Sequence, residues 1–165
     1  MPAAGRLRYT RAVKELHTEI EIAASPERVW RTLTDFASYR AWNPLLPSAR
    51  GELREGEIVR VQLKTGRRPI TIKPRIVRVV PNRELTWRGS LPIPGLFTGE
   101  HHFEIHVLGD ARVRFHQWEQ FSGLLVPLLS RMLDGETRRG FEAMNAALKA
   151  RAEAAEAATR VADRA

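Results

Sequence analysis

Three histidines lie close together in the segment GEHHFEIHV, which covers residues 99–107. Imidazole nitrogens bind transition metals and exchange protons near neutral pH, so His101, His102 and His106 are the first candidates for chemistry. Side chains alternate between the two faces of a β-strand. Whether the segment forms a metal site, an acid–base site or an ordinary strand therefore depends on which face each ring occupies.

The histidines belong to a long run of predicted strands. Residues 48–121 consist of short strand-forming segments that are separated by turn signals such as GRRP, PNR, LPIPG and GDA. Strands that follow one another through short turns indicate an antiparallel meander. A further strand is predicted for His17–Ala23, and two short helices are predicted directly after it for SPERVWRTLTD and FASYRAWNP. Within the meander, Pro74 suggests a bulge or an edge position.

The last part of the chain has helical periodicity. From residue 126 onwards, apolar or small residues recur at spacings of three and four, which predicts one long amphipathic helix. These residues are Leu129, Met132, Leu133, Thr137, Gly140, Phe141, Met144 and Leu148. The expected fold is α+β: a curved, seven-stranded antiparallel sheet that wraps around the long C-terminal helix, with two short helices after strand 1. Residues 1–15 are expected to be a loose leader, residues 16–155 a single ligand-binding domain and residues 156–165 a fraying tail.

The GDA turn predicts the register of the two strands beside it. A three-residue loop over 109–111 places His101 opposite Glu119 and Phe103 opposite Gln117. The odd-numbered face of this hairpin carries most of the apolar residues. It is therefore predicted to be the concave, inner face of the sheet.

The even-numbered residues of the hairpin are predicted to face solvent. They include His102, His106 and His116, with the large apolar Trp118 as an exception. His102 and His106 are separated by about 13 Å along the strand, and His116 approaches either of them only diagonally. A zinc site needs three or four ligands that converge on the ion. The sequence therefore predicts a solvated strand, with no metal and no cofactor, on this face.

His101 differs from the other histidines because a carboxyl group is predicted directly across from it on the inner face. Glu119 would orient the imidazole and raise its pKa, whereas burial would lower it. One interpretation is a polar anchor or a general acid–base pair in the wall of a ligand pocket, with His101 and Glu119 as the catalytic residues. The other interpretation is a hydrogen-bonded core pair with no ligand role.

Aromatic and methionine side chains surround this pair on the predicted inner surface. Such a lining suits an apolar or planar ligand, although each of these residues also suits an ordinary hydrophobic core. The predicted ligand-binding residues are Trp42, Trp87, Phe97, His101, Phe103, Gln117, Glu119, Phe121, Met132, Phe141 and Met144. The segment SLPIPGLF is expected to be either a lid over the cavity or a stiff connection between strands.

Composition narrows the function classes. The chain has no cysteine, which excludes disulfides, thiolate metal sites and cysteine nucleophiles. It has no apolar run of the roughly 20 residues that a membrane span requires and no secretory signal pattern, so a cytoplasmic location is expected. The formal net charge is +8. The basic residues are scattered and accompany no nucleic-acid-binding motif, which favours a solvated surface over a specific nucleic-acid site.

Separated blocks of the sequence, taken in order, resemble the SRPBCC proteins of the START-like superfamily, and in particular their polyketide cyclase/dehydrase-like members. The blocks are ASPERVWRTLTDFASYRAWNP, IKPRIVRVVPNRELTWRGSLPIPGLFTGEHHFEI and RFHQWEQFSGLLVPLL. The resemblance implies the helix-grip fold and a cavity, between the sheet and the long helix, that binds hydrophobic ligands. It implies cavity or cavity-edge positions for Trp42, Trp87, His101, Phe103, Glu119 and Phe121, and it identifies no catalytic residue.

Three functions remain open at this point. The leading hypothesis is a monomer or homodimer that binds or carries a small hydrophobic molecule, aromatic or lipid-like, with His101 and Glu119 at the polar end of its cavity. An alternative is a polyketide cyclase/dehydrase-type enzyme that uses His101 with Glu119 as acid and base. A second alternative is a basic-surface module that binds an anionic membrane or RNA, and whose association weakens steeply with salt.

Overall fold

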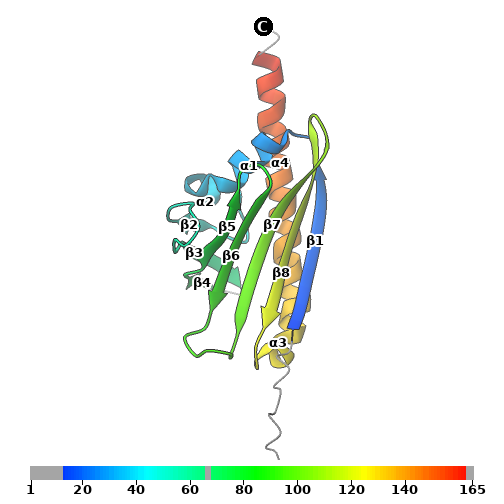
Figure 1. Cartoon of the computed structure of the whole chain (residues 1–165). Helices are drawn as coiled ribbons and strands as arrows, with labels where there is room; N and C mark the ends of the chain where they lie inside the picture. Colours follow the sequence, from blue (N-terminus) through cyan, green and yellow to red (C-terminus); the bar gives the residue numbers. More distant parts are fainter. Residues whose placement is uncertain (1–12, 66–67, 163–165) are drawn as a thin grey trace, which may run out of the picture.

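The computed structural model describes residues 13–65 and 68–162 and has the expected α+β architecture. The strands are β1 (Val13–Ile22), β2 (Ser48–Arg50), β3 (Arg60–Thr65), β4 (Arg68–Ile72), β5 (Arg75–Val80), β6 (Glu84–Ser90), β7 (Thr98–Gly109) and β8 (Arg112–Ser122). The helices are α1 (Pro26–Thr34), α2 (Tyr39–Trp42), α3 (Val126–Met132) and α4 (Arg138–Ala162), with a 3-10 turn over Phe36–Ser38 and a π-helical segment over Leu133–Thr137. Figure 1 shows α4 upright behind the sheet, with its C-terminal end extending past the strands. The expected leader lies outside the described residues up to position 12, and β1 already begins at Val13.

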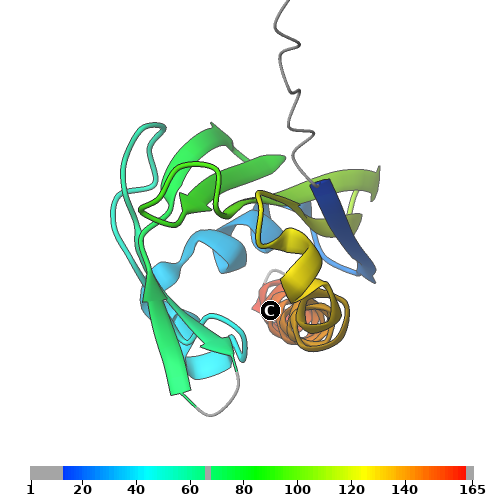
Figure 2. The ribbon, with the colours of Figure 1, turned by 90° about the horizontal axis from the view of Figure 1, so that it is seen from below.

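The strands form two antiparallel sheets. One contains five strands in the order β1-β8-β7-β6-β5, and the other contains three strands in the order β2-β3-β4. Figure 2 looks along α4: the five-stranded sheet arches over the interior, and β3 and β4 stand at the side of the molecule opposite the helix. Among the strands, β1 makes the main contact with α4. The helix α1 also packs on α4. The chain therefore grips its C-terminal helix, as predicted.

The predicted single seven-stranded sheet is wrong in its strand count, because the segment ITIKPRIVRVV is interrupted at Lys73 and Pro74. Proline has no backbone N–H with which to continue a ladder. As a result β4 pairs with β3, whereas β5 pairs with β6. The two sheets remain joined by main-chain hydrogen bonds, among them Val59 N–H to Pro74 O at 3.0 Å and Ile76 N–H to Glu57 O at 2.8 Å. The first half of the predicted GRRP turn, residues 66–67, lies outside the described residues, and its second half begins β4.

The register predicted for the β7–β8 hairpin is confirmed over most of its length. His101 pairs with Glu119, and Phe103 pairs with Gln117. Near the turn the register shifts by one residue, so that Gly109 rather than Leu108 pairs with Arg112. The shift lies beyond the inner polar residues, and their orientation is therefore unaffected.

The first helix begins where the sequence indicates. Ser25 caps α1 by accepting a hydrogen bond from Arg28 N–H at 3.3 Å, and Pro26 occupies the first turn. Val29 and Leu33 are fully buried on the inner side of this helix. The short helices thus close one end of the space between the five-stranded sheet and α4, which we call the grip.

The C-terminal helix is continuous from Val126 to Ala162, although Leu133–Thr137 winds as a π-helix. Beyond this segment, α4 buries Phe141, Met144, Leu148 and Ala152 at the predicted helical spacing. The expected tail is helical as far as residue 162, while residues 163–165 lie outside the described part. Within the residues that the structure describes, no helix is long and apolar enough to cross a membrane.

Candidate functional site

His101 lies inside the grip, as predicted. Only 6% of its surface is exposed, and its ring is stacked between those of Phe103 and Phe141, whose centroids are 4.3 and 4.7 Å away. Trp87 meets it nearly perpendicularly, with the ring centroids 6.0 Å apart. Aromatic rings therefore cover both faces of the imidazole, and only its edge is available to polar partners.

Both imidazole nitrogens face side chains of β8. Gln117 Nε2 donates a hydrogen bond to His101 Nε2 over 2.9 Å, so the neutral ring carries its hydrogen on Nδ1. His101 Nδ1 lies 3.5 Å from Glu119 Oε2. Gln117 is fully buried, and its Oε1 atom has no hydrogen-bond partner among the described residues. We call Gln117, His101 and Glu119 the inner polar row.

Burial sets the charge state of the inner polar row. It lowers the pKa of His101 to about 3 and raises the pKa of Glu119 to about 8. Of the two opposing effects that the sequence suggested for the imidazole, only desolvation operates, with a smaller contribution in the same direction from the nearby His102. At neutral pH the imidazole is therefore neutral, and Glu119 is a protonated carboxylic acid that can donate a hydrogen bond.

Glu119 lies at the edge of the packed core. Its side chain is 17% exposed, compared with 8% for that of His101. A Cβ atom at position 99 would overlap Glu119 Oε1, so the glycine there makes room for the carboxyl group. Gly99 pairs with Phe121 across the hairpin, and the Phe121 ring lies 5.8 Å from that of Phe97. The carboxyl group therefore adjoins an aromatic pair.

Exposed apolar side chains lie on the β6–β7 loop, on the segment before α3 and on α3 itself, next to this aromatic pair. The β6–β7 loop and the segment before α3 are joined by hydrogen bonds from Leu124 N–H to Gly95 O at 3.1 Å and from Leu125 N–H to Leu96 O at 3.0 Å. The exposed residues are Leu91 (43%), Ile93 (64%), Leu124 (63%), Leu128 (80%) and Met132 (43%). We call them the apolar loop surface. The segment SLPIPGLF was predicted to be a lid or a connection, whereas Leu124 and Leu128 had no predicted role, although leucines beside a glycine turn were a visible signal.

The predicted ligand-binding residues do not all meet at one place. The buried ones, which pack in the core, are Trp87, Phe103, Gln117, Phe121, Phe141 and Met144. Phe97 is half-buried at the loop end. The inward position predicted for Met132 is wrong: it is 43% exposed on α3, and the next residue, Leu133, turns inward in its place.

Trp42, predicted to lie in the cavity or at its edge, lies away from the inner polar row. It is half-buried and lines an open groove of about 680 Å³ between the short helices and α4. The groove walls include Arg28, Arg31 and Arg151. None of the inner polar row borders this groove, which therefore lies apart from the predicted site.

The outer face of the hairpin is less exposed than predicted. Trp118, the apolar exception in the pattern, stacks parallel to His102 with the ring centroids 3.7 Å apart and stacks on His17 at 5.4 Å. Burial lowers the pKa of His102, against the opposing effect of nearby carboxylates. The indole is thus covered by imidazoles of β7 and β1.

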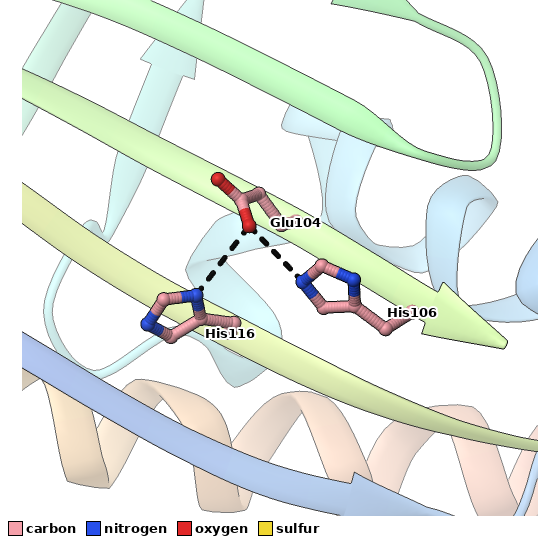
Figure 3. Close-up of side chains that lie close together, drawn as sticks. All are labelled: Glu104, His106 and His116. Atoms are coloured by element: carbon pink, nitrogen blue, oxygen red, sulfur yellow. Dashed lines mark hydrogen bonds and ion pairs between the residues drawn. The ribbon is translucent and has the colours of Figure 1, made fainter. Parts of the chain in front are cut away.

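Glu104, His106 and His116 converge on this face (Figure 3). Glu104 Oε2 lies 3.0 Å from His106 Nε2 and 3.4 Å from His116 Nδ1. Trp118 Nε1 donates to the other carboxylate oxygen, Oε1, over 2.8 Å. The diagonal approach of His116 to His106 was predicted, but their convergence on Glu104 was not. The predicted register already placed Glu104 opposite His116, which was the available signal.

Comparisons with known proteins agree with the observed fold. Residues 14–153 match the family described as polyketide cyclase/dehydrase and lipid transport. Among solved structures, the ZhuI aromatase/cyclase from a Streptomyces species is similar with a TM-score of 0.72 and 18% identity, over 86% of this chain and 94% of that one. A point mutant of Thalictrum flavum norcoclaurine synthase in complex with a transition-state analogue has a TM-score of 0.69 and 15% identity, over 87% and 96% of the two chains.

A third similar structure is TTHA0849 from Thermus thermophilus, with a TM-score of 0.69 and 18% identity, over 86% of this chain and 99% of that one. At these identities the solved structures show a shared fold. A search of curated proteins finds no match to the sequence. The family match spans most of the chain, and the protein belongs to the polyketide cyclase/dehydrase and lipid transport family.

Proposed function

We propose that the protein binds a small hydrophobic molecule that has an aromatic ring and a hydrogen-bond acceptor, and that Glu119 holds the acceptor. One observation carries the proposal: a carboxyl group whose pKa burial raises to about 8 lies at the edge of the core, beside an aromatic pair. His101 carries its hydrogen on Nδ1, which faces Glu119 Oε2 at 3.5 Å, so the imidazole offers this carboxyl group no acceptor. The acid hydrogen of Glu119 is therefore left for another partner, and a carbonyl or phenolic oxygen of a ligand would accept it.

The apolar loop surface is the proposed entrance. Large apolar side chains that are exposed together mark binding surfaces more often than single exposed residues do. Phe97 connects this surface to Phe121 and hence to Glu119. The family description, which includes lipid transport, supports a hydrophobic ligand. The names of an aromatase/cyclase and a norcoclaurine synthase among the similar structures support an aromatic one.

A second function, catalysis of a cyclase or dehydratase type, is favoured by the pKa of Glu119. A general acid works best when its pKa lies near the operating pH, and burial raises this pKa to about 8. Glu119 would protonate a carbonyl oxygen of the substrate while an enol carbon of the same molecule attacks the carbonyl carbon. The C=O π bond becomes the new hydroxyl group, the enol C=C pair forms the C–C bond, and the enol O–H proton returns to the Glu119 carboxylate. His101 would position the carboxyl group, because Phe103 and Phe141 enclose its ring. The sequence predicts the opposite assignment, in which His101 is the acid–base group and Glu119 orients it.

Thermal unfolding with three probes tests the binding proposal: 2-naphthol, oleate and cholesterol. We expect 2-naphthol to raise Tm, since a ligand at 100 times its Kd stabilises the native state by about 2.7 kcal/mol. Phe97→Ala and Glu119→Leu should reduce the shift, whereas Glu119→Gln, whose amide still donates, should retain most of it. His106→Gln, on the outer face, is the matched control.

The proposal fails if none of the three probes changes the Tm of the wild-type chain and native mass spectrometry detects no co-purified molecule. Catalysis has its own test, because Glu119→Gln should still bind 2-naphthol but should not cyclise a poly-β-keto thioester. Equal turnover by Glu119→Gln and wild type would show that the carboxylic acid of Glu119 takes no part in the reaction.

A further inference from the structure

We propose that Glu104, His106 and His116 form a binding site for a divalent transition-metal ion, such as Zn²⁺, on the outer face of the five-stranded sheet. Their side chains come from neighbouring positions on β7 and β8 (Figure 3). They lie on the face opposite the inner polar row, because successive side chains of a strand alternate between faces. The site is therefore separate from the proposed ligand site.

The donor set and its spacing fit such an ion. Two imidazole nitrogens and one carboxylate oxygen are a common set of protein ligands for zinc, and a solvent molecule then completes a tetrahedron. Zinc–ligand bonds of about 2.0–2.1 Å place neighbouring ligand atoms roughly 3.3 Å apart. Glu104 Oε2 lies 3.0 Å from His106 Nε2 and 3.4 Å from His116 Nδ1. All three ligand atoms lie within 4.8 Å of one another, so small side-chain rotations complete the set.

The surrounding hydrogen bonds would orient these ligands and leave one carboxylate oxygen and the correct imidazole nitrogen free for the ion. Trp118 Nε1 donates to Glu104 Oε1 at 2.8 Å, which leaves Oε2 for the ion. His116 Nε2 lies 3.2 Å from His17 Nδ1, and His17 Nε2 lies 3.1 Å from Glu15 Oε2. With the ion on His116 Nδ1, the hydrogen on its Nε2 is donated to His17, and His17 donates in turn to Glu15. Metal-bound histidines usually have such a partner for the second nitrogen.

The outer surface is open and locally acidic. The His106 side chain is 55% exposed, so an ion and its remaining water ligand have access. The adjacent strand β1 presents Glu15, Glu19 and Glu21 on the same exposed side. Arg114, the cross-strand neighbour of His106, lies 3.5 Å from Glu21 Oε1, and this contact offsets its charge. The surroundings therefore favour a cation although the whole chain carries a formal charge of +8.

Calorimetric titration of the full chain with Zn²⁺, without a polyhistidine tag, tests the proposal. We expect one ion per wild-type chain. His106→Gln and His116→Gln should each weaken binding by about 100-fold or more, and His17→Gln, which removes only the supporting hydrogen bonds, by about 10- to 100-fold. The isosteric Glu104→Gln should also weaken it while keeping side-chain volume. The matched control is His102→Gln, on the same face of β7 but outside the three ligands, and its affinity should be unchanged.

Titration with Co²⁺ gives a direct view of the coordination, because the visible ligand-field bands of the bound ion should appear in the wild type and disappear in His116→Gln. Circular dichroism of each variant confirms that it is folded. Failure of the wild-type chain to bind Zn²⁺, or equal losses in His102→Gln and His106→Gln, would overturn the site. Neither result bears on the inner polar row, whose probe, 2-naphthol, is measured separately.

Discussion

Each face of the β7–β8 hairpin pairs histidine with glutamate, but the two glutamates have pKa values shifted in opposite directions. Inside the grip, burial raises the pKa of Glu119 to about 8 and lowers that of His101 to about 3. Outside, burial alone would raise the pKa of Glu104, but hydrogen bonds from an indole and two imidazoles outweigh it, and the pKa lies below its usual value. The difference comes from the number of donors that each carboxyl group receives and from its access to water, because both terms enter a pKa.

This contrast separates the chemistry that each face can perform. A protonated carboxyl group such as Glu119 donates a hydrogen bond and can act as an acid, but it is a poor ligand for a cation. The ionised Glu104 has the reverse properties. A histidine–glutamate pair in a sequence therefore has no fixed chemistry until its face and its hydrogen-bond donors are known.

The largest expected difference between the faces is in packing. Phe103 is fully buried and stacks on His101, so Phe103→Ala should lower the free energy of unfolding by about 3–5 kcal/mol. His106→Ala, on the exposed side of the same strand, should change it by less than about 0.5 kcal/mol. Urea unfolding of the two variants measures both values. Similar losses in the two would show that the outer face is packed as tightly as the core.

The pH dependence of stability should report the two buried groups. The folded-state pKa of Glu119 is raised from 4.5 to about 8, so its contribution is complete below pH 4.5 and is lost as pH rises toward 8. The folded-state pKa of His101 is lowered from 6.5 to about 3, so its contribution is complete above pH 6.5 and is lost as pH falls toward 3. The two slopes cancel between the two ordinary pKa values.

In urea unfolding, these groups should make wild-type stability nearly flat from pH 4.5 to 6.5 and lower it on either side. The decline above pH 6.5 should reach at most about 1.4 kcal/mol per pH unit. Glu119→Gln should lack this alkaline decline, whereas the control His106→Gln should keep it. An alkaline decline of the same slope in Glu119→Gln would assign it to other groups.

Much of the inner face could be predicted from the sequence, because alternation along a strand is a local rule. The pairing of His101 with Glu119 follows from one turn and the apolar pattern. The cap at Ser25 and the spacing of buried residues in α4 follow from equally local signals. These predictions needed no knowledge of how distant segments pack.

The rest depends on contacts between segments that are far apart in the sequence. Pro74 was recognised as an irregularity, but its effect of dividing the strands between two sheets depends on which partners β4 and β5 find. Met132 is exposed directly before a π-helical segment, whose winding the 3.6-residue pattern did not predict. The cover over Trp118 includes His17 from β1, a strand nearly a hundred residues away in the chain. No local pattern encodes these contacts.

A smaller difference is expected between two glycines that face each other across β6 and β7. A Cβ atom at Gly99 would overlap Glu119 Oε1, whereas one at Gly89 would meet only Pro74 Cβ at 3.8 Å. Gly99→Ala should therefore lower the free energy of unfolding by about 1–3 kcal/mol, and Gly89→Ala should change it by about 0.5 kcal/mol or less. Equal effects in urea unfolding would mean that the carboxyl group does not occupy the space above Gly99.

The smallest expected effect concerns the donor that most distinguishes Glu104 from Glu119. Trp118→Phe keeps an aromatic ring against His102 but removes the N–H that donates to Glu104. Loss of this hydrogen bond should cost about 1 kcal/mol and should move the pKa of Glu104 upward, toward its ordinary value, in an NMR titration of the side-chain carboxyl carbon.

Trp42→Phe is the matched control, since it removes the hydrogen bond that the Trp42 indole, on the short helix α2 rather than on the sheet, donates to Ser38 in the preceding 3-10 turn. It should leave the Glu104 titration unchanged. If the Glu104 titration stays in place in Trp118→Phe as well, the imidazoles alone keep this carboxylate ionised. The contrast between the two faces would then rest on histidine contacts and solvent, with no part for the indole.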